Sequence, residues 1–317
     1  MSRSPTAAPP EFYEAARRGL EAHPKQLPAV WVYDERGSQL YEEITRLPDY
    51  YPPRREAEIL RRYAPEIARR GHARTLVELG AGNARNTRFL LDALAEAHTL
   101  ERFVPVDVSE EMLRSTARAI AAAYPGIQVD EIVGDFERDL TAPSGHGPRL
   151  IALLGGTIGN LYPKQRAALL GTLARNLARD DALLLSVDLV KEEGRLVAAY
   201  NDPTGVTEAF VRNALNALNR ELKATFEQRR FVYEAFWDAN NEWVDIGLRA
   251  RNRHNVVVER LGLELSFESG EWLRVEVSSK FRREKFEPEL ARARLHVESW
   301  LTDPAGDFSV VLARREG

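Results

Sequence analysis

Hydrophobic positions in the middle of the chain switch repeatedly between two periods. Short apolar runs have the length of buried strands, and between them apolar residues recur at three- and four-residue spacing, as on one face of a helix. The predicted strands are 75–80, 102–107, 127–133, 148–155 and 182–189, and the predicted helices are 85–97, 110–124 and 162–178. Strands that alternate with helices of this length predict an α/β fold, a mostly parallel, doubly wound sheet with right-handed crossovers.

The segments on either side of this region follow other patterns. Before it, short helical patterns are interrupted by prolines, and tyrosines are frequent. After it, a helical pattern at 205–226 precedes polar, strand-like segments that are typical of antiparallel pairing, with Asn240-Asn241 as their turn. The last apolar segments, WLRVEVSSKF and FSVVLARR, are predicted to be strands that return to the main sheet or its edge.

These patterns divide the chain into five predicted parts. They are a disordered N-terminus (1–10), the N-terminal part of a substrate-binding lobe (11–63), a sheet core (64–193), an insertion that completes the lobe (194–270) and C-terminal strands that return to the core (271–317).

Composition narrows the class of protein. The chain has 317 residues, of which 44% are hydrophobic and 29% charged, as is usual for a soluble globular protein. Its net charge of −4, with both signs interspersed, predicts no nucleic-acid partner. The absence of cysteine excludes disulfides, thiolate catalysis and cysteine-bound metals. Without a signal-like or membrane-spanning apolar run, or a histidine metal motif, we expect a cytoplasmic, metal-free monomer that does not bind membranes.

The first predicted strand leads into a glycine turn, in the stretch TLVELGAGNARNTR at 75–88. Gly80 and Gly82 fit the start of a dinucleotide motif, but Arg85 stands where its third glycine would be, which disfavours NAD. The E-x-G-x-G form suits a nucleoside without a pyrophosphate, such as S-adenosylmethionine (SAM). A tight turn that needs glycine only for its backbone conformation is an equally good interpretation of this short pattern.

Polar residues at the next strand ends are candidates for holding such a nucleoside, because ligands of these sheets bind at the carboxyl ends of the strands. Asp107 could accept hydrogen bonds from a ribose, or it could cap the following helix. Asp135 could accept from an adenine amino group with Phe136 beside the ring, or it could be a turn residue.

The fourth predicted strand ends in the unusual stretch GGTIGN. Gly155 and Gly156 would expose backbone carbonyls where a reacting group must lie close to the cofactor. Asn160 suits a substrate amine or carboxylate, or it could cap a helix. In the late segment VEVSSKF, Glu276 and Ser278 alternate with valines, for which a solvated polar face is the simplest interpretation.

Several stretches together resemble one known family, the histidine-specific SAM-dependent Nα-methyltransferases of ergothioneine biosynthesis. The stretches are LYEEITRLPDYYPPRREAEIL, VELGAGNARNTRFLLDAL, FVPVDVS, GDFERDL, LLGGTIGNL and LRVEVSSKF. They occur in order from about Trp31 to the C-terminus, and LPDYYP and GGTIGN are far more specific than the glycine turn.

The resemblance implies a Rossmann-like methyltransferase sheet with a substrate-binding lobe. It implies transfer of three methyl groups from SAM to the α-amine of L-histidine, giving hercynine, through proximity and orientation and without a catalytic base. The implied SAM-binding residues are Gly80, Asn86, Asp107, Asp135 and Phe136. On the substrate side, Tyr50, Asn160 and Tyr200 would position carboxylate and amine, Glu276 and Ser278 would bind the imidazole, Tyr33 and Gly155 would lie near the amine, and Ile246 would line the imidazole pocket.

The chain departs from the family pattern at three positions. Asn86 stands where the family usually has lysine, Ile246 where it has methionine, and Tyr41 where it often has phenylalanine. Two alternatives therefore accompany the histidine hypothesis: an Nα-methyltransferase for another aromatic amino acid, such as tryptophan, and a SAM-binding protein without turnover.

Overall fold

The computed structural model describes residues 10–27, 32–136 and 147–316. The predicted disordered N-terminus lies outside these residues, except for Pro10, which begins the first helix. The described residues form two compact units, one of those up to residue 50 together with 192–278, and the other of those between 51 and 191 together with 279–316. We call them the smaller and the larger unit.

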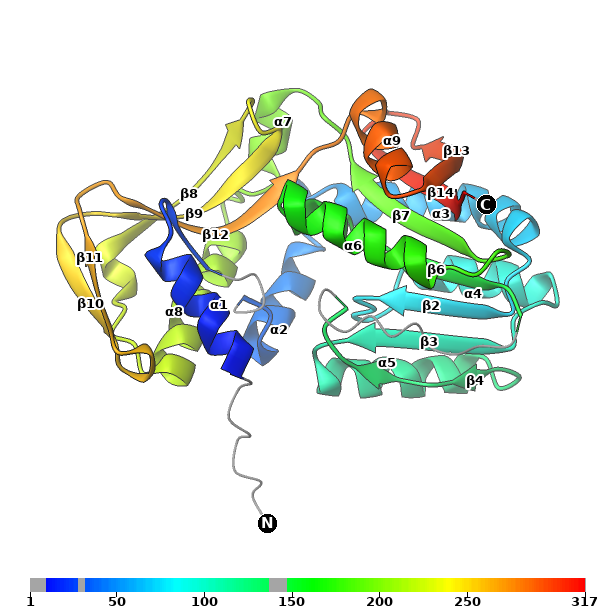
Figure 1. The fold of residues 1–317 in the computed structure, drawn as a ribbon, viewed down its shortest axis with the longest axis horizontal. Coiled ribbons are helices and arrows are strands. Elements are labelled where there is room, and N and C mark those ends of the chain that lie inside the picture. The colour runs from blue at the N-terminus through cyan, green and yellow to red at the C-terminus, as the bar shows by residue number, and fades with distance from the viewer. Residues whose placement is uncertain (1–9, 28–31, 137–146, 317) are drawn as a thin grey trace, which may run out of the picture. The chain divides into compact units, whose positions relative to one another are not determined.

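The larger unit is built on the predicted doubly wound sheet, with strand order β13-β14-β7-β6-β2-β3-β4 and β5 paired to β3 (Figure 1). Pairs among β2, β3, β4, β6 and β7 are parallel, whereas β14 runs antiparallel to β7 and β13. The strands are β2 (Thr75–Leu79), β3 (Arg102–Asp107), β4 (Gln128–Val129), β5 (Ile132–Val133), β6 (Arg149–Leu153), β7 (Ala182–Asp188), β13 (Leu295–Thr302) and β14 (Phe308–Arg315).

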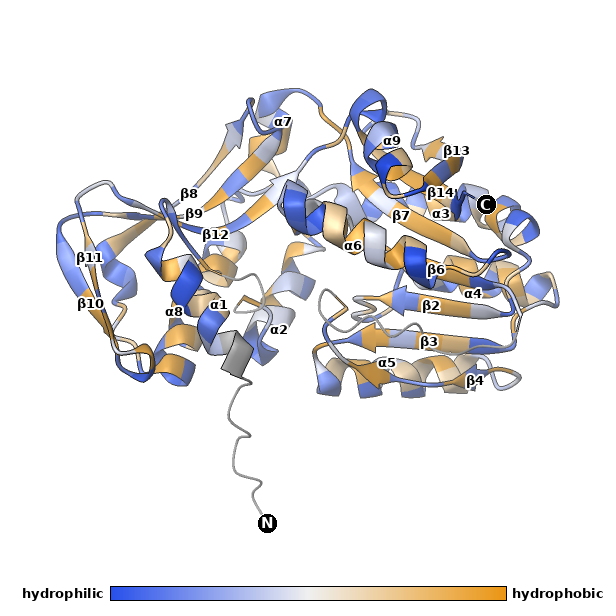
Figure 2. Ribbon diagram, viewed as in Figure 1, coloured by the Kyte–Doolittle hydropathy of each residue, from blue (hydrophilic) through white to orange (hydrophobic). Residues whose placement is uncertain are grey.

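The helices of this unit confirm the predicted alternation and enclose the sheet between two cores. They are α3 (Pro52–Gly71), α4 (Thr87–Glu96), α5 (Glu110–Ala123), α6 (Pro163–Asn176) and α9 (Arg283–Arg292), with the 3₁₀ turn η2 (Thr157–Asn160) after β6. The core on one face of the sheet contains Leu76 of β2 and residues of α3 and α4. The core on the other face contains Val77 of β2 and residues of α6 and α9. Figure 2 shows hydrophobic residues along these strands.

One predicted strand of this sheet is interrupted. The segment 127–133 forms the two short strands β4 and β5 on either side of Asp130 and Glu131. The Asp130 N–H donates to the Phe103 carbonyl between the two pairings. Among the described residues, no helix is both long and apolar enough to span a bilayer.

The smaller unit has a four-stranded sheet in the order β1-β12-β9-β8 and a separate antiparallel hairpin, β10-β11. Its helices are α1 (Pro10–Glu21), α2 (Glu35–Ile44), α7 (Glu193–Ala198) and α8 (Val206–Leu222). Its strands are β1 (Lys25–Gln26), β8 (Phe231–Asp238), β9 (Trp243–Ala250), β10 (His254–Val258), β11 (Leu263–Phe267) and β12 (Trp272–Ser279). The predicted turn at Asn240-Asn241 joins β8 to β9, and both its N–H groups donate to Asp238.

The prediction that both C-terminal segments return to the main sheet is wrong for the first of them. FSVVLARR is β14 of the main sheet, but WLRVEVSSKF contains β12, which lies between β1 and β9. A glycine makes this pairing close, because a Cβ at Gly247 of β9 would lie 2.3 Å from the Leu273 carbonyl oxygen. Residues 271–278 thus belong to the smaller unit, and residues 51–63, which were expected in the lobe, belong to the larger one.

Candidate functional site

The glycine turn after β2 brings together three of the residues predicted to hold SAM. Gly80 and Gly82 adopt positive φ angles of 71° and 49°. Asp107, at the end of β3, accepts hydrogen bonds from the Gly82 N–H (2.9 Å) and the Ser109 N–H (2.9 Å). A Cβ at Gly80 would lie 3.4 Å from the Phe136 ring, an ordinary contact distance, so this ring lies beside the turn. Asp135 directly precedes Phe136 and is partly buried.

The Asn86 side chain is directed into the protein. It lies at the N-terminus of α4, and its amide nitrogen donates to Glu56 Oε2 (2.7 Å) and to the Pro53 carbonyl (3.0 Å). Both amide hydrogens are therefore used by α3, and a contact of Asn86 with SAM stays a prediction that would have to use its remaining oxygen.

Sequence reasoning missed Glu56 of α3, which has 2% of its surface exposed. Its Oε1 accepts from the Gly155 N–H (2.6 Å) and from the Ser186 hydroxyl. Burial raises the pKa of Glu56, and hydrogen bonds from Ser186, Asn86 and Gly155 oppose that rise. The available signal was its position, because Glu56 precedes Ile59 and Leu60 by three and four residues and so lies on the apolar face of a helix, where charge is unusual.

A second buried carboxyl group lies directly before the glycine turn. Glu78 is 3% exposed, and its Oε1 accepts from the Thr87 hydroxyl. Its Oε2 is buried and has no hydrogen-bond partner among the described residues. Burial raises the pKa of Glu78 to about 8, so this acid is mostly neutral at pH 7.

The end of β6 lies next to the end of β2, because the two strands are paired in parallel. Gly155 and Gly156 both have positive φ angles, of 71° and 68°, and η2 follows them. Asn160, at the end of η2, is partly buried, and its side chain makes no hydrogen bond to any described residue. It is thus available to a ligand.

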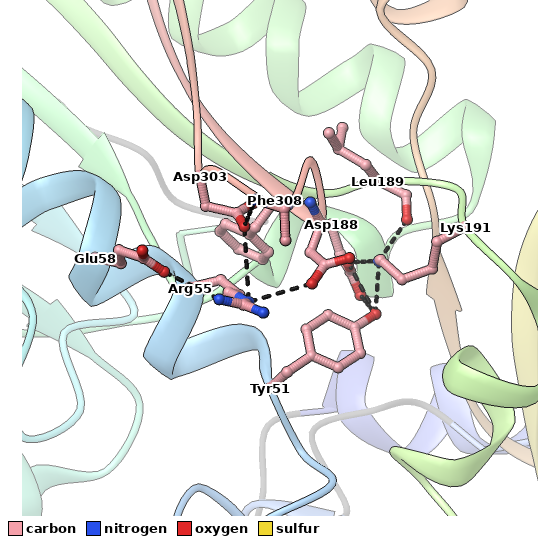
Figure 3. Close-up of polar contacts among 10 residues, drawn as sticks. Tyr51, Arg55, Glu58, Asp188, Leu189, Lys191, Asp303 and Phe308 are labelled. Atoms are coloured by element: carbon pink, nitrogen blue, oxygen red, sulfur yellow. Dashed lines mark hydrogen bonds and ion pairs between the residues drawn. The ribbon is translucent and has the colours of Figure 1, made fainter.

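In the larger unit, near the points where the chain passes to the smaller unit, the buried carboxylate of Asp188 binds several side chains (Figure 3). Asp188, at the end of β7, accepts from the Tyr51 hydroxyl (2.8 Å) and pairs with the ammonium groups of Lys191 and Lys280 (2.8 Å for Lys280). Lys191 also donates to the Tyr51 oxygen at 2.7 Å. Burial lowers the pKa of Lys191, and Asp188 opposes this. We call these four residues the Asp188 cluster.

In the smaller unit, tyrosine hydroxyls contact the two residues predicted to bind an imidazole. The Tyr33 hydroxyl donates to Glu276 Oε1 (3.4 Å), and the Tyr200 hydroxyl donates to Ser278 Oγ (2.8 Å). The Tyr50 and Tyr200 rings meet edge to face, with centroids 5.8 Å apart. The structure therefore brings five predicted substrate residues of this unit together.

Burial patterns on β12 separate the two faces as the alternation predicted. Val275 and Val277 are each 1% exposed, whereas Glu276 and Ser278 are only partly buried. Ile246, at 1% exposure, lies opposite Ala235 in the β8–β9 pairing and belongs to the core of this unit.

The tyrosines of this group are donors at physiological pH. Burial is the main cause that raises the pKa of Tyr33 and of Tyr50 well above the ordinary value, and the Glu276 charge adds to it. Both keep their phenolic protons and can donate to a carboxylate.

Comparisons with known proteins give one family model and several similar sequences. A family model described as "Histidine-specific methyltransferase, SAM-dependent" matches residues 12–315. The chain is 51% identical over 299 residues to the histidine N-alpha-methyltransferase of Mycolicibacterium smegmatis, covering 94% of this chain and 93% of that protein. It is 48% identical over 297 residues to the protein of the same name from Mycobacterium tuberculosis, covering 94% of this chain and 92% of the relative. It is also 32% identical over 240 residues to ergothioneine biosynthesis protein 1 of Schizosaccharomyces pombe, covering 68% of this chain and 31% of the relative.

Proposed function

Because the chain belongs to the family of histidine-specific, SAM-dependent methyltransferases, we propose that it transfers three methyl groups from SAM to the α-amino group of L-histidine, giving hercynine for ergothioneine biosynthesis. The observation that carries the proposal for this chain is the pair on β12: a carboxylate and a hydroxyl, each contacted by a tyrosine hydroxyl, on one face of one strand.

The larger unit supplies groups that fit a nucleoside with a sulfonium. Asp107 lies at the end of β3, where it can accept from ribose hydroxyls, and the positive-φ glycines leave space at the neighbouring turn. Phe136 beside Gly80 offers a ring face to adenine, and Asp135 an acceptor to its amino group. When bound, SAM supplies a methyl group on a positively charged sulfur.

The smaller unit supplies groups that fit histidine. Glu276 can accept one ring N–H, and the Ser278 hydroxyl can complement the other ring nitrogen. Tyr50 and Tyr200 would bind the carboxylate and amine. A side chain without the ring nitrogens would leave these polar groups unpaired, which costs orders of magnitude in kcat/KM.

Each transfer needs a neutral amine and no strong base. The amine lone pair forms the new N–C bond while the S–C bond breaks and its electron pair stays on sulfur. A proton leaves to water before each of the three attacks, and the product is a quaternary ammonium. The residues contribute mainly by holding the amine in line with the methyl group, which can supply several kcal/mol.

Mass spectrometry of the products after incubation with SAM and single amino acids tests the proposal. We expect histidine to gain three methyl groups. Methylation of tryptophan but not histidine would instead establish the alternative substrate. SAM binding with no methylated amino acid would establish a binding protein without turnover.

A further inference from the structure

We propose that Glu56 and Ser186 are positioning residues that aim the backbone carbonyl of Gly155 at the methyl-accepting amine. The inference rests on the proposed function, in which Gly155 is already expected near the amine, and adds the two side chains that orient its carbonyl.

Two adjacent backbone N–H groups at the end of β6 are held from the inside of the larger unit. The Gly155 N–H donates to Glu56 Oε1 (2.6 Å), and the Gly156 N–H donates to Ser186 Oγ (3.2 Å). The Ser186 hydroxyl in turn donates to the same oxygen of Glu56. Ser186 is fully buried in β7, and Glu56 is 2% exposed, so both are fixed by the surrounding core. One carboxyl group therefore holds both amides, one directly and one through the serine.

Peptide planarity converts these contacts into a direction for the carbonyl. In a trans peptide the C=O points opposite to the N–H of the same unit. The Gly156 N–H points to Ser186, so the Gly155 C=O points away from the buried serine. Gly155 is exposed, and its carbonyl oxygen accepts no hydrogen bond from the described residues. By contrast, the preceding Leu154 carbonyl accepts from the Thr157 hydroxyl (2.8 Å).

The position of this carbonyl fits an amine about to be methylated. It lies at the carboxyl end of β6, beside the glycine turn of β2, where ligands of such sheets bind. An acceptor there can bind an N–H of the neutral amine and so turn its lone pair toward the methyl group. Positive φ at both glycines leaves this turn with little intrinsic rigidity, which the two side chains supply.

Each methylation removes one N–H, and this makes the inference testable. The attacking amine carries two N–H groups in histidine, one in Nα-methylhistidine and none in Nα,Nα-dimethylhistidine. A hydrogen bond to Gly155 can therefore assist the first two attacks but not the third. A residue that acted only through general stability would affect all three alike.

The experiment measures single-turnover rates at saturating SAM with histidine and, separately, with Nα,Nα-dimethylhistidine. Ser186→Ala removes the acceptor for the Gly156 N–H, and we expect the rate with histidine to fall about 5- to 10-fold. Glu56→Met keeps the length of the side chain but removes both oxygens, and we expect a fall of about 10- to 100-fold. With the dimethylated substrate we expect both variants to stay within about 2-fold of the unsubstituted protein.

Two control variants separate the effect of the Gly155 carbonyl from other effects of substitution. Ser309→Ala removes a fully buried hydroxyl from β14, the strand next to β7, without touching the glycine turn, and should leave both rates unchanged. Asn86→Ala removes the partner of Glu56 Oε2 and should change SAM affinity more than the ratio of the two rates.

The outcomes separate the inference from the function on which it rests. If the unsubstituted protein does not methylate histidine, the proposed function fails, and the inference fails with it. If it does, equal losses with both substrates, or no loss in Ser186→Ala, would overturn the role of Gly155 alone. Should Glu56→Met fail to fold, Ser186→Ala decides the question by itself.

Discussion

The two units present their candidate ligand groups in different chemical forms. In the larger unit, backbone N–H groups of glycines are held by carboxyl groups: Gly82 by the partly buried Asp107, and Gly155 by the buried Glu56. In the smaller unit, the groups are side chains on a strand, held by tyrosine hydroxyls. Burial raises the pKa of both kinds of group, but with opposite consequences at neutral pH. The pKa of a buried carboxyl group moves toward 7, whereas the pKa of a buried tyrosine moves further above it.

The largest effect that we expect is a pH dependence of the free energy of unfolding, caused by the buried Glu78 of the larger unit. The pKa of Glu78 is raised by burial from an ordinary 4.5 to about 8 in the folded state, so the folded protein holds this proton more tightly than the unfolded chain. Its contribution to stability is fully present below about pH 4.5 and is lost as pH rises through about 8. The free energy of unfolding should fall by up to about 5 kcal/mol from this group alone.

Denaturant unfolding at several pH values checks this. Glu78→Gln removes the titration, so the stability of the variant relative to the unsubstituted protein should increase steadily from pH 5 to pH 9. A pH-independent difference between the two would contradict the assignment.

A smaller effect is expected from a substitution in the smaller unit, which should weaken the binding of histidine but not of SAM. Glu276→Ala removes the proposed acceptor of the imidazole N–H, and histidine KM should rise about 10- to 100-fold, as for loss of a hydrogen bond to a charged group. SAM affinity, measured by calorimetry, should stay the same. Glu264→Ala, an exposed glutamate on β11 of the same unit, is the control. Equal losses for SAM and histidine would remove Glu276 from the substrate side.

The reverse selectivity is expected in the larger unit. Asp107→Ala should weaken SAM binding about 10-fold, through loss of the proposed ribose contacts and of the acceptor for the Gly82 N–H. Histidine KM at saturating SAM should change little. Asp107→Asn keeps one acceptor oxygen and should lose less. Unchanged SAM affinity in the alanine variant would refute the ribose assignment.

The smallest effect concerns the Asp188 cluster, which uses a tyrosine in the larger unit. Tyr51→Phe removes the hydroxyl that donates to Asp188 and accepts from Lys191, and should lower the free energy of unfolding by about 1 kcal/mol. Tyr124→Phe removes a hydroxyl that donates to Asp92 nearer the surface and should cost less. A larger loss in the Tyr124 variant would show that burial does not set the strength of these bonds.

Local pattern predicted the sheet core well, because each central strand is mostly apolar and each helix has an apolar face. It failed where partners lie far apart in sequence. β12 belongs to the smaller unit because it pairs with β9, at a close approach that Gly247 allows. The sequence of neither strand indicates this pairing. The sequence of β12 showed the alternation of apolar and polar residues, but it did not show that tyrosine hydroxyls contact the polar ones.

The candidate site was predicted mainly through resemblance and strand ends, and the roles of its residues stay predictions. Glu56 was missed because a carboxylate that binds backbone amides leaves no spacing motif. Its partners Asn86, Gly155 and Ser186 are separated from it by 30, 99 and 130 residues. Only folding the chain shows that they share one acceptor.

The Asp188 cluster has a consequence for how such a chain can be rebuilt. The chain crosses between the units at 50/51, 191/192 and 278/279, and Tyr51, Lys191 and Lys280 each lie within two residues of one crossing. All three attach to the same carboxylate of the larger unit. If a foreign segment replaces the smaller unit at these junctions and the carboxylate and its three partners are left in place, each junction keeps its anchor in the larger unit.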